Sequence, residues 1–311
     1  MIASIETTQC RSWEEYCHSH RLADGAPLEA IYRGHADLSW RLVAPSARDR
    51  FQQYRRLRDT KQDVIVGGPA SPGQIKYFKL LATGLPGVDL SGLEEIDVEA
   101  LARHHGLCSN LLDWTRSPFI AAFFAFSSAL DQANSGRLLN GTLEHGPLFM
   151  PREPVCIWRL SIADELWVQE EFVPLNSLAA VNFWQKAQCG IFTRLIHNDH
   201  LDVVDYLASR KLESRLHRFV IQGSETCKAL SELESMNITY STLFPDLRGT
   251  AIQANVGGLG GFPVAFDVTS YYYCPRRRVT CRRAKTEGTA IRQHKNQMVS
   301  HNTGGAGTNS S

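Results

Sequence analysis

The sequence of 311 residues has almost no excess of charge and no long hydrophobic run. Lys and Arg number 33 and Asp and Glu 32, so the net charge is +1. Without an overall field, the chain would attract nucleic acid or an acidic membrane only through a local patch. The longest apolar run, 119–126, is too short to span a bilayer, and residues 1–11 lack the features of a secretory signal. We therefore expect no membrane partner.

Cysteine pairs and familiar catalytic motifs are also missing. The eight cysteines are scattered and none forms a CxxC pair, which favours reduced thiols in a cytoplasm over disulfides or a metal site. Walker A, HExxH and GxSxG motifs are absent. The glycine-rich stretch 257–261 lacks the GxGxxG order of a dinucleotide loop.

The chain does have enough apolar residues, 43%, to bury a core. Apolar periodicity and capping residues predict an α+β fold, with a central mixed β-sheet flanked by helices. The expected strands cover residues 30–32, 155–160, 190–193 and 216–221. The expected helices cover 13–20, 48–63, 74–81, 98–105, 118–130 and 224–236, with Ser12, Asp97, Ser117 and Ser224 as N-caps.

Composition divides the chain into three parts. We expect a helical extension over residues 1–27, a main domain over 28–255 and a poorly ordered, Gly- and Arg-rich tail over 256–311. A polar stretch from about 134 to 146 is expected to be a surface insertion.

Three clusters combine polar groups with rigid supports. In the first, Tyr32–His35, an arginine at the end of a strand offers a fork of donors to a phosphate or carboxylate. Gly34 beside it would let a ligand approach the backbone. The alternative is an ordinary surface arginine next to a turn glycine.

The second cluster joins His104 and His105 to the segment 111–118. Both histidines are predicted to lie near a helix C-terminus, whose dipole favours the imidazolium form. Asp113 lies among apolar residues, so we expect it to be at least half buried and to need a partner. It is either a catalytic group or a structural brace satisfied by one of the histidines.

In the third cluster, 188–193, Gln188 either points its amide at a ligand or only bonds to backbone. A nucleophilic Cys189 is not favoured, because no base is specified for it.

In this order the clusters resemble the FRG domain, a bacterial domain named for its (F/Y)RG motif. The residues that carry the resemblance lie at 31–35, 40–42, 45–48, 99–107, 111–118, 188–193 and 243–247, and the last segment reads LFPDL. The resemblance covers roughly residues 28 to 255. It departs from the family at 108–110, where Cys-Ser-Asn stands in place of Pro-Thr-Arg.

The (F/Y)RG strand is also similar to the first motif of arginine-type ADP-ribosyltransferases, which implies NAD as a substrate. On that analogy Tyr32, Arg33 and Gly34 bind NAD, with Arg33 as the clamp. Trp114 or Phe192 forms an apolar wall for nicotinamide. Asp113, Thr115 or Ser117 orients its ribose, and Gln188 stands near the ribose and the acceptor. The resemblance then implies a toxin or phage-defence effector with a protein or nucleic-acid acceptor, and a neutralising partner protein is consistent with that role.

Two other functions are consistent with the same residues. One is a metal-independent nuclease or phosphotransfer enzyme that uses His104 or His105, with His105 as the catalytic candidate, and holds phosphate with Arg33. The other is a non-catalytic nucleotide-binding or interaction module in which the motifs bind a nucleotide or brace the core.

Overall fold

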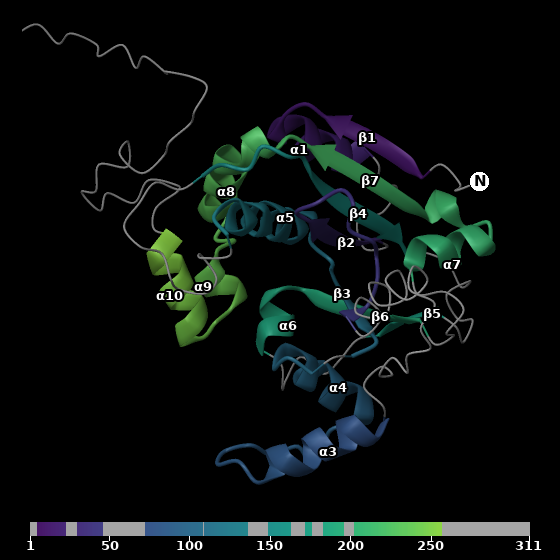
Figure 1. Cartoon of the computed structure of the whole chain (residues 1–311), viewed down its shortest axis with the longest axis vertical. Helices are drawn as coiled ribbons and strands as arrows, with labels where there is room; N and C mark the ends of the chain where they lie inside the picture. The colour runs from purple at the N-terminus through teal and green to yellow at the C-terminus, as the bar shows by residue number, and fades with distance from the viewer. Residues whose placement is uncertain are drawn as a thin grey trace, which may run out of the picture. The chain divides into compact units, whose positions relative to one another are not determined.

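The strands of the computed structural model join into one mixed sheet, in the order β1-β7-β4-β2-β3-β6-β5 (Figure 1). The structure describes residues 5–22, 30–45, 72–107, 109–135, 149–162, 172–175, 183–195 and 202–256, all of them in one compact unit. The strands are β1 Glu6–Cys10, β2 Ala30–His35, β3 Leu111–Thr115, β4 Val155–Ser161, β5 Phe172–Leu175, β6 Gly190–Leu195 and β7 Leu216–Ile221. With helices on its faces, this sheet confirms the α+β prediction.

The backbone pairing between neighbouring strands is shortest between β2 and β3. These strands pair at a single position, Tyr32 opposite Thr115. By contrast, β2 pairs with β4 along all of Ala30–His35, and β3 pairs with β6 along all of Leu111–Thr115. All of these pairings are antiparallel, as are those of β4 with β7 and of β5 with β6, whereas β1 runs parallel to β7. Two well-paired halves therefore meet at one residue pair.

Helices flank this sheet. They are α1 Trp13–Leu22, α3 Pro72–Thr83, α4 Glu95–His104, α5 Pro118–Ala133, α6 Phe183–Ala187, α7 Val203–Ser209, α8 Thr226–Ser235, α9 Tyr240–Leu243 and α10 Leu247–Val256. Short 3-10 turns precede β7 and α8.

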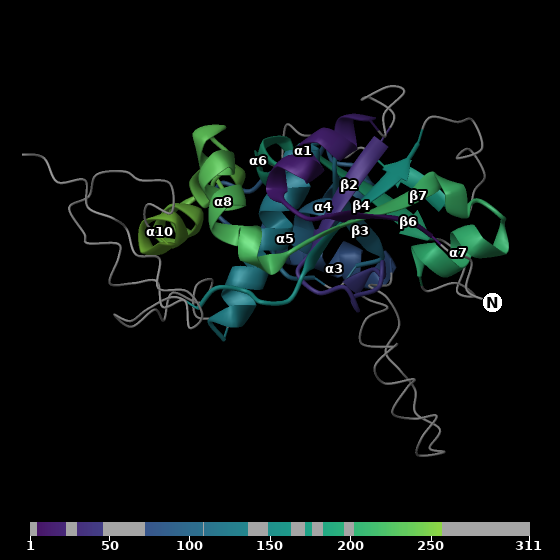
Figure 2. The ribbon, with the colours of Figure 1, turned by 90° about the horizontal axis from the view of Figure 1, so that it is seen from above.

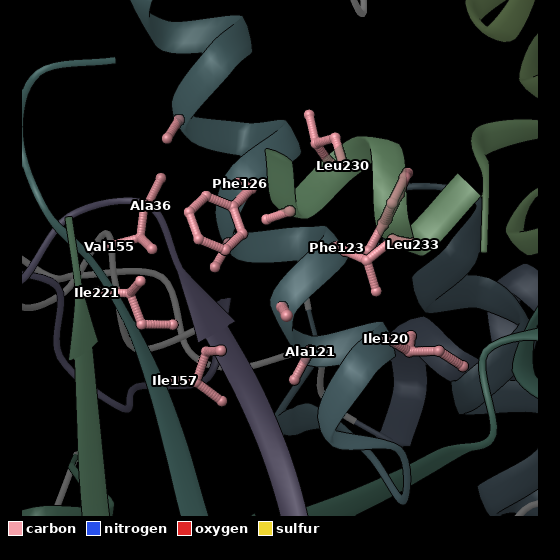
Figure 3. Packing of buried hydrophobic residues seen from close by; sticks show 14 of the residues in the cluster. Ala36, Ile120, Ala121, Phe123, Phe126, Val155, Ile157, Ile221, Leu230 and Leu233 are labelled. Carbon is pink, nitrogen blue, oxygen red and sulfur yellow. The ribbon is translucent and has the colours of Figure 1, made fainter. Parts of the chain in front are cut away.

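The apolar helix α5 is the centre of the larger core. Ser117 caps it as predicted, since its hydroxyl accepts a hydrogen bond from the Ile120 amide at 3.2 Å, and Pro118 occupies the first turn. Phe126 on α5 packs in the same cluster as Ile157 and Ile221 of the sheet (Figure 3). Leu233 of α8, which lies beside α5, belongs to it as well (Figure 2). Burial of this apolar surface supplies most of the stabilisation of the fold.

A second core lies on the other face of the sheet and extends across both of its halves. It joins Trp158 and Leu160 of β4 to Trp114 of β3, and α7 covers it with Val203 and Leu207. The two halves therefore share a core where their backbones scarcely pair.

Several predictions need correction. Strand β2 does not end at Arg33 but runs on to His35. Asp97 is buried inside the first turn of α4 and is not its cap, and Ser224 lies in a 3-10 turn before α8. The segment expected to be a helical extension begins with strand β1, which no sequence pattern indicated. The predicted helix 48–63, most of the predicted insertion and the tail after Val256 lie outside the described residues.

Candidate functional site

A cavity of about 280 Å³ lies where the two halves of the sheet meet. β2 and β3 contribute the central part of its wall. Residues of α4 and α5, Trp40 from the segment after β2, Gln188 directly after α6 and Phe244 directly after α9 complete it. The lining residues are Tyr32, Arg33, Gly34, His35, Trp40, His104, Asp113, Trp114, Thr115, Phe124, Ser128, Gln188 and Phe244. Arg33 and Gln188, which are far apart in the sequence, are thus brought to the same hollow.

Asp113 is held in this cavity by two arginines. Arg103 of α4 donates to both carboxylate oxygens, at 3.1 Å from its Nε to Oδ1 and through Nη2 to Oδ2. The Nη1 of Arg33 lies 3.7 Å from Oδ2 and donates to the Asp113 carbonyl. The partner that the brace alternative assigned to a histidine is instead a pair of guanidinium groups, whose planar forks suit a carboxylate. These contacts also tie α4 and β2 to β3.

The charge balance keeps Asp113 ionised. Burial by itself raises the pKa of a carboxyl group, but the charges of Arg103 and Arg33 and the Arg103 hydrogen bonds outweigh it, so the pKa of Asp113 is lowered. The side chain keeps 37% of its surface exposed, so it is more than half buried, as predicted. The cavity is therefore lined by an ionised carboxylate at neutral pH.

Only one of the two adjacent histidines lines the cavity. His104 does, and its ring packs against Trp184 with the ring centroids 5.6 Å apart. His105 is exposed at the end of α4 and does not line the cavity, and its ring contacts Trp184 with the ring centroids 5.5 Å apart. Burial lowers the pKa of His104, since the nearby Asp113 carboxylate does not compensate for it. The lowered pKa of His104 runs against the expected preference for the imidazolium form, because burial disfavours the charged ring.

Gln188 is held by one side-chain and one main-chain hydrogen bond. Its side-chain Nε2 donates to the main-chain carbonyl of Leu243 at 3.1 Å, and its main-chain carbonyl accepts from the Thr115 hydroxyl at 2.7 Å. Of the two interpretations that the sequence left open, backbone bonding is thus observed for the amide nitrogen. The residue still lines the cavity, and it links the end of α9 to β3.

Gly34 is required by packing as well as by the site. A Cβ at this position would lie 1.9 Å from the Ala121 carbonyl oxygen and 2.7 Å from the Ala125 nitrogen, both in the backbone of α5. We predicted that this glycine lets a ligand approach the backbone. The close approach seen here is that of a helix, although the residue also lines the cavity.

Three predicted site residues serve the core or a helix end. Phe192 is buried with Leu111, away from the cavity, and Ser117 is occupied as the α5 cap. Trp114 lines the cavity but is only 4% exposed, and its indole N–H donates to the Thr193 hydroxyl at 2.8 Å. Its ring is therefore part of the core and not an open wall.

Residues that sequence reasoning did not assign to the site supply the aromatic surface. Trp40, 42% exposed, lies after β2, and Phe124 and Phe244 come from α5 and from the LFPDL segment. Arg103 also escaped notice, because nothing in its sequence context points to Asp113. Trp40 and Phe244 lie in segments that carry the family resemblance, and that was the only available signal.

Among the described residues, no group of three or more His, Cys, Asp or Glu side chains is placed to hold a metal ion. No helix in the part of the chain described is both long and apolar enough to cross a membrane.

Residues 28–134 match the FRG domain, so the chain contains this domain from just before β2 to the end of α5. The matched span holds Arg33, His104 and Asp113, whereas Gln188 and Phe244 complete the cavity from beyond it. No curated protein and no solved structure matches the chain.

Proposed function

Because the chain contains an FRG domain over residues 28–134, we propose that the cavity lined largely by this domain binds NAD and that the protein is an ADP-ribosyltransferase-like enzyme. The observation that supports this most is the convergence of Arg33, Asp113 and Gln188 on one hollow with aromatic walls. A guanidinium fork suits a diphosphate, and aromatic faces suit the planar rings of a dinucleotide.

The charge in the cavity suits the reaction. When the glycosidic bond of NAD breaks, its electron pair goes to the nicotinamide ring, which leaves as a neutral molecule. The ribose becomes oxocarbenium-like until a nucleophile of the acceptor attacks it and loses a proton. A carboxylate near the sugar stabilises that positive charge, and Asp113 stays ionised to do so. In this scheme Arg33 holds the diphosphate, and Thr115 and Gln188 lie near the ribose.

The aromatic contacts are assigned to different residues than the sequence suggested. Trp114 and Phe192 are buried in cores, so Trp40, Phe124 and Phe244 take the role of walls for the rings of NAD. The acceptor is a protein or nucleic acid, and a toxin or phage-defence effector with a neutralising partner protein is the biological setting that fits such an activity.

The test is NAD binding and nicotinamide release by the purified protein, with cell extract as a source of protein and nucleic-acid acceptors. Arg33→Ala is expected to weaken NAD binding at least tenfold and to abolish release, because it removes the charged fork. Arg152→Ala, an exposed arginine that does not line the cavity, is the matched control and should behave as wild type. A wild-type protein that neither binds NAD nor releases nicotinamide overturns the proposal.

One observation favours a second candidate, a non-catalytic nucleotide-binding module. Asp113 is engaged by both Arg103 and Arg33, as a brace between α4, β2 and β3 would be. Such a module binds NAD or another nucleotide without turnover, so binding without nicotinamide release distinguishes it from the enzyme. The nuclease hypothesis stays an untested prediction, and if it is pursued His104 is the histidine in the cavity.

A further inference from the structure

His35 is a buried titratable group of the cavity to which the proposed reaction gives no role. It closes strand β2, and only 1% of its surface is exposed. Its ring contacts Arg33, Trp158 and Trp40. The Nε of Arg33 lies 3.1 Å from its Nε2, the Nε1 of Trp158 lies 3.3 Å from its Nδ1, and the Trp40 ring packs edge-on at 5.8 Å between centroids.

These contacts place two donors on one imidazole. The Nε–H of arginine and the indole N–H of tryptophan can only donate. A neutral imidazole has one acceptor nitrogen, and a protonated one has none. Only one of the two contacts can therefore be a hydrogen bond at a time, and the tautomer of His35 decides which.

The charged donor is expected to prevail. Hydrogen bonds from an ionised donor are stronger than those between neutral groups, and the contact to Arg33 is also the shorter of the two. In that case His35 carries its proton on Nδ1, and its Nε2 accepts from Arg33. The indole N–H of Trp158 then has no acceptor in Nδ1, and its 3.3 Å contact has to lengthen or turn aside, because two N–H hydrogens cannot share that line.

We infer that His35 is a positioning residue that fixes Arg33 and Trp40 for a ligand with a planar ring and a phosphate. Its Nε2 holds the Nε edge of the guanidinium, while Nη1 is held by the carbonyl and carboxylate of Asp113. Fixing a guanidinium at two edges sets the plane of its donors before the ligand arrives, which reduces the entropy lost on binding. The ring of His35 meanwhile supports the exposed indole of Trp40 at the cavity. This inference rests on the proposed NAD site for its ligand.

The tautomer is measured by nitrogen-15 NMR of the histidine rings, which needs no ligand. We expect His35 to be neutral and protonated at Nδ1. Arg33→Lys removes the Nε donor, so the proton should move to Nε2 and Nδ1 should accept from Trp158. Trp158→Phe removes the competing donor and should leave the tautomer unchanged. A wild-type His35 protonated at Nε2, or a shift caused by Trp158→Phe and not by Arg33→Lys, overturns the inference.

Binding of NAD to two variants measures the effect on the ligand. His35→Phe keeps a ring beside Trp40 but has no acceptor, and we expect NAD to bind about tenfold more weakly. His35→Gln offers an amide oxygen to Arg33 and should stay within about threefold of wild type. Titration of Trp40→Ala with adenosine diphosphate ribose and with nicotinamide mononucleotide shows which ring of NAD rests on the indole. The ligand that carries this ring should lose affinity relative to wild type.

The outcomes separate the two proposals. If wild type binds NAD and His35→Phe binds it equally well while folded, the positioning role is wrong and the proposed function stands. If wild type does not bind NAD, the proposed function fails, and the NMR measurement still decides whether His35 holds Arg33. If His35→Phe does not fold, retained binding in His35→Gln together with the expected tautomer supports the role, and loss of binding in folded His35→Gln contradicts it.

Discussion

The two halves of the sheet differ in how they are held together. In the half formed by β1, β7, β4 and β2, the strands pair along most of their length and α5 packs against them (Figure 1). The half formed by β3, β6 and β5 is equally well paired internally, but it meets β2 at one residue pair only. At that junction, contacts of the Arg33 side chain with Asp113 connect the two strands, and the cavity lies there. The site therefore lies where backbone pairing is shortest and charged side chains connect the two halves.

Two acidic residues, Asp113 and Glu99, differ in how far neighbouring arginines compensate for their burial. Asp113 at the junction is partly exposed and has two arginine neighbours, and its pKa is lowered. Glu99 of α4 is 3% exposed and pairs with Arg194 of β6. Burial raises the pKa of Glu99, since the single arginine does not fully compensate for it. Ionisation of Asp113 therefore stabilises the fold, whereas ionisation of Glu99 costs free energy.

The largest effect is expected in the half that α5 covers. Gly34→Ala would place a Cβ 1.9 Å from the Ala121 carbonyl oxygen, and helix backbone cannot move aside cheaply. We expect the free energy of unfolding, measured with denaturant, to fall by about 3 kcal/mol or more.

The matched control is Gly92→Ala, because a Cβ there meets nothing within 4 Å. It should change the free energy of unfolding by no more than about 0.5 kcal/mol. Equal effects of the two substitutions would show that α5 does not pack on β2 as closely as described.

A smaller loss is expected at the junction. Asp113→Asn removes the counter-charge of Arg103 and Arg33, and we expect the free energy of unfolding to fall by about 2 kcal/mol, which is below the value for a fully buried pair because the side chain is partly exposed. Asp205→Asn, which breaks an exposed pair with Arg41, is the control and should cost about 0.5 kcal/mol or less. If both substitutions cost the same, Asp113 is not a brace.

The pH dependence provides a separate check on Asp113. With a lowered pKa in the fold, the unfolded chain binds more protons, so the contribution of Asp113 is complete above the ordinary aspartate pKa of about 3.9. It is lost as the pH falls through that value towards the folded pKa. The stability difference between wild type and Asp113→Asn, measured by denaturation at a series of pH values, should be constant near neutrality and shrink below about pH 4. A difference that persists undiminished in acid would contradict this assignment.

The smallest effect is expected at Glu99. With a raised pKa, its contribution is present below the ordinary glutamate value of about 4.3 and is lost as the pH rises through the folded pKa. Glu99→Gln removes the ion pair with Arg194 but also the cost of a buried charge, so stability at pH 7 should change by less than about 1 kcal/mol. A loss as large as that of Asp113→Asn would remove the contrast between the two acids.

Local patterns in the sequence predicted many of the elements and the first residues of several, but few of their last residues. Ser117 and Pro118 marked the start of α5, and Gly106, with φ at 95°, marks the turn after α4 as expected. Asp97 looked like a cap because aspartate favours that position, yet α4 begins earlier and buries it. Strand β1 escaped notice because its parallel pairing with β7, at the other end of the described chain, leaves no local pattern.

At the site, the sequence indicated the segments better than it indicated the side chains. The motifs around Arg33, Asp113 and Gln188 do meet in one cavity. Which of His104 and His105 faces it, and whether Phe192 or Trp40 is the open ring, depends on side-chain direction relative to packed neighbours. Arg103 could not be paired with Asp113 from the sequence, because the contact requires α4 to lie against β3.

The amino-acid sequence by itself determined that this chain folds as an α+β domain and that α5 is buried. It also determined which three segments carry the polar groups of the site. Those properties follow from composition, periodicity and capping, which act between residues close along the chain. Only the tertiary structure decided that β2 and β3 meet at a single pair and that two arginines hold Asp113 there. Contacts between distant residues depend on how whole elements pack, and no local pattern encodes that.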